Sequence, residues 1–341
     1  MMPRPLMFAI TAICWLCLLD RWIVAQDLHY SMPFQKGIWL NPAESGLGIE
    51  KFRVSGAHKS QWAAVSKPFV TYQAGFDSYL GARDADWRLS YGLLVWRDQA
   101  GDGHLGTTAA QLHLATSIPL AVKEHRLQAG IALGWNQRSL DFSRLRFDAS
   151  YDGNQYNPDF GIPEQLGRQS FSFVDLAAGL VWEKRDDELK FWKSGVSVWH
   201  INQPGQSFFH EDSIPLDVRY TVYLQHGYQA RNDWYLRPEV LVSVQGPFRE
   251  YLLGSWIGYV LEETAFGMTT MEAGLFTRAG DALVLSLGGQ RNAWTLSMAY
   301  DVNYSGLRRA SQWRGGWELN IMYVIGNSQP PRLRVPACLL M

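Results

Sequence analysis

The feature that most constrains the fold is an alternation of apolar with polar or small residues, which recurs along most of the chain. A two-residue repeat is the signature of a β-strand whose faces have different surroundings. In the clearest example, residues 294–304, one face carries Trp294, Leu296, Met298, Tyr300, Val302 and Tyr304, and the other Thr295, Ser297, Ala299, Asp301 and Asn303. The chain is therefore predicted to be all-β, as a membrane barrel with its apolar face outside or a soluble sandwich with that face inside.

About fourteen such segments can be placed, and no tandem repeat or linker divides the chain. They span roughly 48–58, 69–80, 87–99, 106–118, 125–140, 170–184, 189–202, 218–230, 234–246, 249–262, 270–279, 282–291, 294–305 and 314–326. Many run near ten residues, the length of a tilted membrane strand, and an even number is usual in bacterial outer-membrane barrels. We predict a single transmembrane antiparallel β-barrel over residues 48–326.

Composition favours the barrel over a soluble enzyme. Charged residues make up 18% of the chain, against about 25% in a typical soluble domain, and aromatic residues make up 13%. Trp96, Trp135 and Trp182 lie near the ends of their segments, as an aromatic girdle at a membrane interface requires. The net charge of -1 provides no basic field that would attract nucleic acid.

The first 25 residues have the pattern of a Sec signal peptide. Arg4 is followed by an apolar run, 6–19, that is shorter than the about 20 residues of a spanning helix, and Ala25 is a small residue suited to cleavage. We therefore predict a signal peptide at 1–25, export to the cell outer membrane, and a C-terminal tail at 327–341 after the last strand.

Residues 26–47, between the leader and the first strand, have neither pattern. Pro33 and Pro42 disfavour a long helix or strand there. Because a periplasmic N-terminus puts this stretch just before strand one, we predict a short irregular periplasmic segment whose aromatic side chains pack at the barrel's periplasmic mouth. On the same topology the long loops 141–169 and 203–217 lie outside the cell, as expected for outer-membrane barrels.

No residue pattern supports catalysis, a cofactor or a bound metal. The 8 histidines are scattered and lack a metal-ligand spacing such as H-E-x-x-H. His113, His200 and His226 fall on predicted strands, where polar packing in the lumen is the favoured role. A G-x-S-x-G nucleophile elbow and a P-loop are both missing from the sequence. We therefore predict that the protein is not an enzyme.

Specific motifs lie at both ends of the mature chain. After the leader the sequence reads AQDLHYSMPFQKGIWLNPAESG, followed by H-K-S-Q-W at 58–62; near the C-terminus it reads SMAYDVNYSGL (297–307) and GWELNIMY (316–323). These stretches resemble the PorP/SprF family of the type IX secretion system of Bacteroidetes, although Leu28 stands where proline is usual. The N-terminal residues that match are Gln26, Asp27, Tyr30, Ser31, Phe34, Asn41, Pro42, Ala43, Gly46, Gln61 and Trp62.

The resemblance implies a function that the spacing alone does not show. A member is expected to be an outer-membrane barrel, surrounded by outer-membrane lipids, that helps export or hold at the surface cargo proteins with a C-terminal sorting domain. Its other expected partners are the periplasmic type IX ring and peptidoglycan-linked lipoproteins, and nucleic acid is not among them. The alternative is a passive outer-membrane channel for small solutes, which would have an open, charged lumen.

Aromatic and basic residues mark the candidate partner-binding positions, since Tyr and Arg are favoured at binding hot spots. Those predicted are Phe142, Arg144, Arg146, Tyr151 and Tyr156 in the loop 141–169, and Tyr30, Phe34 and Trp39 in the segment 26–47. The alternative is a surface loop without a partner, because loops often carry such residues by chance.

Overall fold

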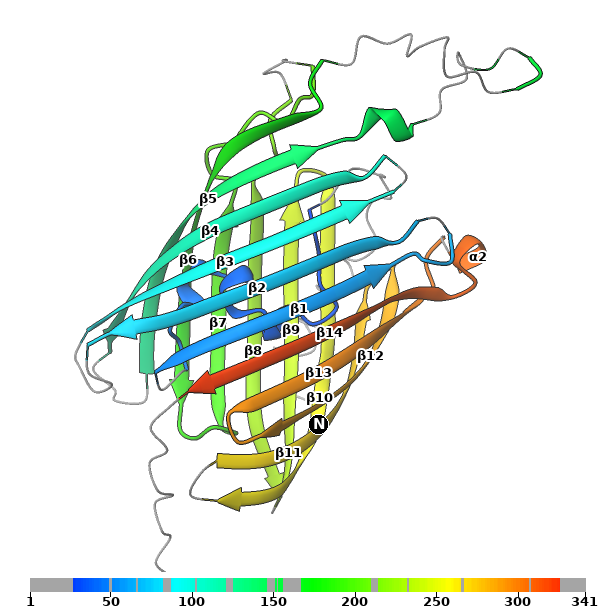
Figure 1. Ribbon diagram of the computed structural model, residues 1–341. Helices are drawn as coiled ribbons and strands as arrows, with labels where there is room; N and C mark the ends of the chain where they lie inside the picture. Colours follow the sequence, from blue (N-terminus) through cyan, green and yellow to red (C-terminus); the bar gives the residue numbers. More distant parts are fainter. Residues whose placement is uncertain are drawn as a thin grey trace, which may run out of the picture.

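Fourteen antiparallel strands form a closed barrel in the computed structural model of this chain (Figure 1). Each strand pairs with its sequence neighbours, and β1 closes the barrel on β14. The strands are β1 (Phe52–Gln61), β2 (Phe69–Leu80), β3 (Arg88–Ala100), β4 (Leu105–Pro119), β5 (His125–Ser139), β6 (Ser170–Arg185), β7 (Phe191–Trp199), β8 (Arg219–Arg231), β9 (Trp234–Gln245), β10 (Phe248–Thr264), β11 (Gly267–Arg278), β12 (Ala282–Arg291), β13 (Trp294–Asn303) and β14 (Arg314–Ile325). The predicted all-β barrel is confirmed, with the largest boundary shift at β1.

The structure describes most of the chain between the leader and the tail. The described residues are 27–48, 51–65, 67–81, 87–101, 103–120, 125–145, 151, 153–155, 167–209, 214–231, 233–264, 267–306 and 308–325. The predicted signal peptide at 1–25 and the predicted tail at 327–341 lie outside them.

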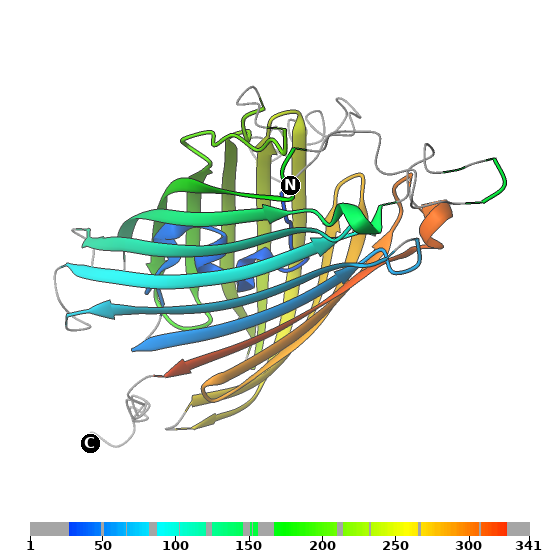
Figure 2. The ribbon, with the colours of Figure 1, turned by 45° about the horizontal axis from the view of Figure 1, so that its top comes forward.

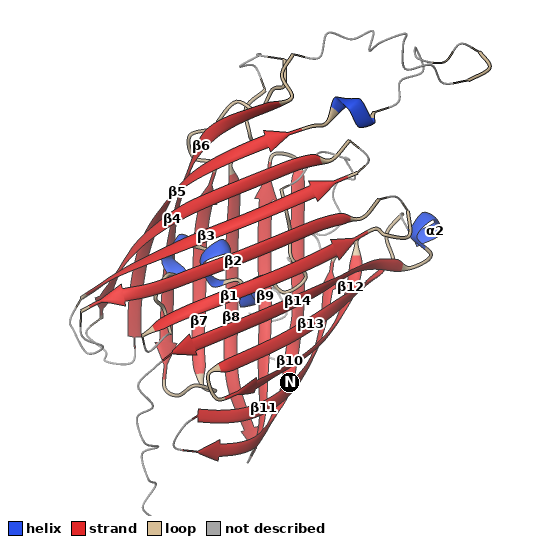
Figure 3. Ribbon diagram, viewed as in Figure 1, coloured by secondary structure: helices blue, strands red, loops and turns tan. Residues whose placement is uncertain are grey.

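Helices in the described part of the chain are few and short, as Figure 3 shows. They are η1 (Pro33–Gln35), η2 (Gly37–Trp39), η3 (Pro42–Glu44), η4 (Phe142–Arg144) and α2 (Arg308–Ser311). Within the described ranges, none of them has the length and apolar character needed to cross a bilayer.

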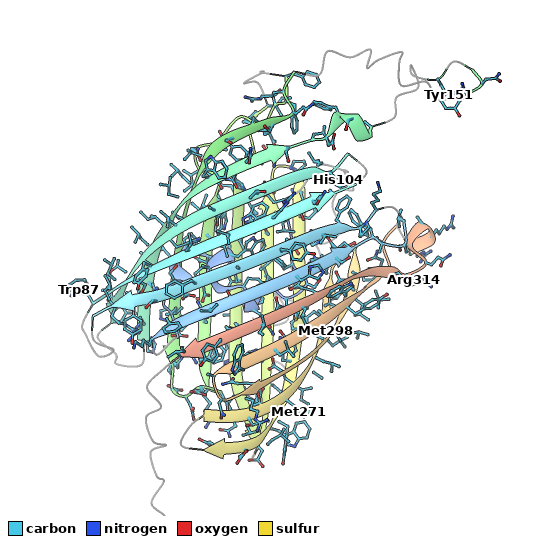
Figure 4. All side chains as sticks on the ribbon, in the orientation of Figure 1. Trp87, His104, Tyr151, Met271, Met298 and Arg314 are labelled. Atoms are coloured by element: carbon cyan, nitrogen blue, oxygen red, sulfur yellow. The ribbon has the colours of Figure 1, made fainter. Side chains whose placement is uncertain are left out.

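The two faces of the sheet carry opposite kinds of side chain. On β13, Leu296 and Met298 point outward and are 54% and 50% exposed, whereas Ser297 and Asp301 point inward and are 2% and 1% exposed. Figure 4 shows outward side chains of this kind around the wall, with Met298 and Met271 labelled. A soluble sandwich would bury its apolar face. Here the polar face is buried and the apolar face is exposed, which excludes the sandwich and supports the membrane barrel.

Aromatic rings encircle the outer face near both rims, as predicted for interface girdles. At one rim, Trp192 on β7 stacks on His226 of β8 with 3.8 Å between ring centroids. The prediction that His226 faces the lumen is therefore wrong, because Tyr223 and Gln225 take the inward positions of β8. Rings in contact at the other rim are His58, Trp62, Phe69, Tyr72 and Trp317.

The two longest connections lie at one end of the barrel, which also carries the short turns 246–247 and 279–281. The β5–β6 and β7–β8 connections share one end, here called the long-loop end (Figures 1 and 2). Residues 186–190 and 292–293 make short turns at the other end, here called the short-turn end. The antiparallel strand order puts all connections after odd-numbered strands at the same end, which agrees with the predicted grouping of the two longest loops.

Candidate functional site

The N-terminal residues 27–48, here called the lumen segment, lie inside the barrel, where Figure 1 shows their blue ribbon behind the front strands. At the long-loop end, the backbone N–H of Asp27 donates to the side chain of Gln245 on β9 (3.2 Å). At the short-turn end, the N–H of Gly46 donates to the Asp77 carboxylate on β2 (2.8 Å). The segment therefore runs along the lumen, which corrects its predicted placement at the mouth.

The short irregular form of the segment agrees with the prediction. Pro33 and Pro42 each occupy the first turn of a 3-10 helix, where a missing N–H costs nothing. Asn41 caps η3, because its side-chain oxygen accepts from the N–H of Ala43 (2.9 Å). The chain thus bends three times in a short space and fits the width of the lumen.

The aromatic residues of the segment form its apolar core. Tyr30 meets Trp39 edge to face at 4.8 Å between centroids, and Phe34 meets Tyr223 of β8 in the same way at 5.7 Å. The wall contributes the inward apolar side chains that surround them: Leu94, Val181, Leu241, Leu252, Trp256 and Phe276. The apolar residues inside the barrel therefore pack against the segment.

One buried ion pair joins the segment to β14. The Lys36 ammonium lies 2.9 Å from a Glu318 carboxylate oxygen, and the two side chains are 2% and 0% exposed. Lys36 also donates to the side chain of Asn320, and the backbone N–H of Ser31 donates to Glu318 (2.6 Å). Each charge thus has a partner and further hydrogen bonds, which a buried ion pair requires for stability.

A second polar cluster surrounds Glu44, in the last turn of the segment. Its carboxylate lies 3.1 Å from the Lys193 ammonium on β7 and accepts a hydrogen bond from the Tyr223 hydroxyl (2.6 Å). Nearby, the guanidinium of Arg53 donates to Asp77 (2.9 Å) and to the Glu44 carbonyl oxygen (3.2 Å). The segment is therefore fixed by charge at its middle and at its end.

Glycines in the wall let the segment approach β5 and β6 closely. The Asn41 amide donates to the carbonyl oxygens of Leu180 (3.1 Å) and Val196 (3.0 Å). A Cβ at Gly179 would overlap the Asn41 side chain, and a Cβ at Gly130 would lie 2.6 Å from the backbone nitrogen of Ala43. Only glycine fits at these two positions while the segment is in place.

Substituting Gly130 by alanine is therefore expected to weaken the docking of the segment. The new methyl group meets backbone atoms of the segment that have no room to move, and overpacking of this kind costs about 1–3 kcal/mol. Gly134→Ala on the same strand is the matched control, because the nearest atom to its Cβ is a side-chain carbon of Gln111 at 3.2 Å. Urea unfolding in detergent should show the larger loss for Gly130→Ala, and equal losses would contradict this account.

Motifs from the two ends of the sequence meet in this site. Lys36, which follows the Tyr-Ser-Met-Pro-Phe stretch, pairs with Glu318 of GWELNIMY. Gln35 accepts a hydrogen bond from Ser297 of SMAYDVNYSGL, and Arg278 bridges Ser31 and Asp301 at 3.4 and 3.1 Å. The stretches that the sequence marks as specific are thus the ones that hold the lumen segment in the barrel.

A type IX secretion system membrane protein model, PorP/SprF, matches residues 23–323. The chain belongs to the PorP/SprF family. It is an outer-membrane β-barrel, as the fold and the family together establish. Among curated proteins no match is found.

Several solved structures are similar to this PorP/SprF barrel. They include the Pseudomonas putida toluene transporter TodX (10% identity, 87% of this chain and 93% of that chain, TM-score 0.47) and the CymD monoaromatic hydrocarbon channel (11%, 86% and 94%, 0.48). A Pseudomonas aeruginosa FadL homologue has 10% identity over 85% of this chain and 94% of that chain, with a TM-score of 0.46.

At the long-loop end, Asp27 is held by His200, the residue that follows β7. The His200 ring nitrogens lie 2.6 Å from Asp27 and 2.9 Å from Asp175 of β6. Burial alone would lower the pKa of His200, but the charge of Asp27 and the hydrogen bonds to both carboxylates raise it to about 9. Burial alone would raise the pKa of Asp27, yet the charge and hydrogen bond of His200 hold it well below its usual range.

This arrangement predicts that the start of the lumen segment loosens in alkaline solution. A group whose pKa is raised by folding contributes stability that is complete below its unfolded value, near 6.5, and is lost as the pH rises through about 9. Hydrogen exchange of the Leu28 and His29 amides, corrected for intrinsic rates, should therefore accelerate above about pH 9. His200→Gln should remove the pH step, and a step that persists in that variant would refute the assignment.

The predicted partner-binding residues divide into two groups that form no common site. Tyr30, Phe34 and Trp39 are buried in the lumen, at 1%, 8% and 9% exposure. Phe142 in η4 is also buried, whereas Tyr151 is 60% exposed and lies well outside the barrel wall (Figure 4). Arg144 lies in η4, and Arg146 and Tyr156 lie outside the described residues. Partner binding by these residues stays a prediction.

Sequence reasoning missed the polar residues that carry the site. Asn41 was visible as part of an Asn-Pro-Ala motif, and Glu318 as part of a C-terminal motif, but neither showed its partner. Glu318 and Lys193 occupy inward-facing positions in the alternation of their strands. This position is a signal that could have identified them, because a charge that faces the lumen needs an opposite charge nearby.

Proposed function

We propose that this PorP/SprF protein holds secreted cargo at the outer surface through its long loops, while its own N-terminal segment keeps the lumen closed. The observation that carries the proposal is the filled lumen, in which a buried ion pair and a capped Asn-Pro turn fix the segment against the wall. Such a barrel suits a binding platform better than a passive channel. The family adds that the protein works with the type IX machinery.

The long loops form a joint surface that supports this role. The backbone N–H of Arg168 donates to the Phe208 carbonyl (3.0 Å), and its guanidinium donates to that of Ser207 (2.9 Å). The rings of Phe171 and Phe208 meet edge to face at 4.9 Å. We call the described residues of the β5–β6 and β7–β8 connections the loop platform. A platform built from two tied loops presents a larger surface than either loop alone.

The partner classes follow from the two ends of the barrel. A cargo protein with a C-terminal sorting domain would bind the loop platform outside the cell, with aromatic and basic loop residues as anchors. The periplasmic ring and the peptidoglycan-linked lipoproteins would meet the short-turn end. Outer-membrane lipids would surround the apolar band between the two girdles.

A capture experiment tests the cargo role. Replacing residues 146–166 by a short Gly-Ser linker should abolish co-purification of sorting-domain proteins with the barrel, because it removes the exposed Tyr151 and the other candidate anchors Arg146 and Tyr156. The control is the same linker inserted at the turn 292–293, at the opposite end. Unchanged capture after the loop replacement would show that the cargo binds elsewhere, and loss in both variants would point to impaired assembly.

A further inference from the structure

A pocket at the long-loop end of the lumen lies between the start of the lumen segment and the wall. It is lined by Asp27 and Trp39 of the segment and by inward residues of β3 to β8. Arg138, near the end of β5, donates to Gln206 of the β7–β8 connection, so this connection lies over the pocket. The pocket therefore lies below the loop platform, and His200 and Leu216 of the β7–β8 connection belong to both.

The pocket gathers hydrogen-bonding groups that have no partner among the residues the structure describes. Side-chain atoms that line it and make no hydrogen bond there are the indole Nε1 of Trp96, the Gln111 Oε1, the Asn136 Nδ2, the Arg138 Nε and the Arg219 Nε. Four of these five are N–H donors. A buried donor without an acceptor costs about 1–3 kcal/mol, so a concentration of them in one pocket indicates a missing acceptor.

The residues that line the pocket also carry more positive than negative charge, which favours an anionic acceptor as the free donors do. The ionisable residues that line it are three bases, Arg138, His200 and Arg219, and two acids, Asp27 and Asp175. With His200 protonated between its two carboxylates, one positive charge remains uncompensated. Water could accept the free donors but cannot supply the missing charge.

Aromatic faces complete the pocket. The Arg219 guanidinium lies between two indoles, 5.1 Å from the centroid of Trp39 and 5.3 Å from that of Trp199. One terminal nitrogen of this guanidinium lies 3.9 Å from Asp27, and its Nε has no partner among the described residues and can still donate. The Arg138 guanidinium lies 5.9 Å from the ring of Phe173. Flat apolar walls beside a free guanidinium edge suit a carboxylate attached to a planar body.

We propose that this pocket binds a single carboxylate group with an aromatic or other flat apolar body, held by the free N–H groups of Arg138, Arg219, Trp96 and Asn136. The carboxylate belongs either to a small solute or to the C-terminal residue of a peptide. Two guanidinium groups favour it because they match carboxylate geometry and carry the uncompensated positive charge. The site does not depend on cargo binding by the loop platform, so either proposal can fail alone.

Isothermal titration of the full chain in detergent micelles tests the pocket. Benzoate is the small probe and benzamide is its neutral counterpart; acetyl-Gly-Gly-Phe with a free or an amidated C-terminus is the peptide pair. Benzoate should bind with a stoichiometry of about one and benzamide should not, since only benzoate supplies the charge. Tighter binding of the free-acid peptide than of benzoate assigns the site to a peptide end, and the reverse order assigns it to a solute.

Variants locate the binding. Arg138→Gln should weaken benzoate about ten-fold or more through loss of a charge-assisted hydrogen bond. Trp96→Phe keeps the ring, removes the free N–H and should weaken binding less, which secures the test if Arg138→Gln does not fold. Arg291→Gln, at the opposite end of the barrel, is the control and should leave the affinity unchanged. Equal binding of benzoate and benzamide, no binding of any carboxylate, or equal affinity in all variants would overturn the proposal.

Discussion

A barrel that lacks residues 28–47 is expected to conduct ions in planar bilayers, whereas the intact protein is expected to stay closed. The deletion removes the aromatic residues of the segment from the lumen and exposes an inner wall on which charged and polar side chains alternate with patches of apolar ones. Lys59, Glu318 and Arg278 on that wall are each less than 5% exposed in the intact protein. Once the segment is gone, water and ions can reach them, as in barrels with a polar interior.

The deletion is designed so that a change in conductance can be separated from a failure to fold. Gln26 and Asp27 remain for processing after the leader, and Gly48 remains before β1. Folding is checked by the heat-dependent migration of barrels in gels and by the β signal in circular dichroism. A folded deletion variant without conductance would show that another part of the chain closes the lumen. Conductance of the intact protein at the same level would favour the passive channel instead.

The barrel could be predicted from the sequence because the alternation of apolar and polar residues within each strand shows which residues share a face. The segment 294–304 alternates without interruption, and β13 occupies Trp294–Asn303. The predicted first strand, 48–58, begins too early, because Gly46 and Gly48 belong to the turn that precedes β1. Both adopt positive φ angles near 68°, which suit a turn and not a strand. Local pattern thus gave strand identity, and its error was largest at this boundary.

The contents of the lumen could not be predicted in the same way. Ser31 and Glu318 are 287 positions apart, and nothing in the alternation relates them. The aromatic residues Tyr30, Phe34 and Trp39 were correctly predicted to pack against the barrel. Packing at the mouth and packing inside the lumen both use aromatic side chains, so residue type alone does not distinguish the two placements. What distinguishes them is the closeness of approach at Gly130 and Gly179, which depends on strand register.

The Lys36–Glu318 pair gives the largest expected effect of a single substitution. Lys36→Met leaves the Glu318 carboxylate buried with its charge unpaired, and breaking a buried pair in this way costs about 3–5 kcal/mol. Removing both charges, with Lys36→Met and Glu318→Leu together, should cost much less, because apolar residues of similar volume replace a buried pair with little loss. The difference between the single and double variants measures the coupling.

The exposed pair Lys184–Asp186 is the matched control for this cycle. Its side chains are 38% and 53% exposed and its charged atoms lie 3.8 Å apart, so Lys184→Met should change stability by about 1 kcal/mol at most. Urea unfolding followed by tryptophan fluorescence gives the free energies, and protease cleavage within residues 27–48 reports whether the segment leaves the lumen first. If Lys36→Met releases the segment while the barrel stays folded, the ion pair is a latch on the segment alone. If Lys36→Met matches the control in both measurements, the pair does not hold the segment, and the closed lumen must rest on the Asn41 and Glu44 contacts.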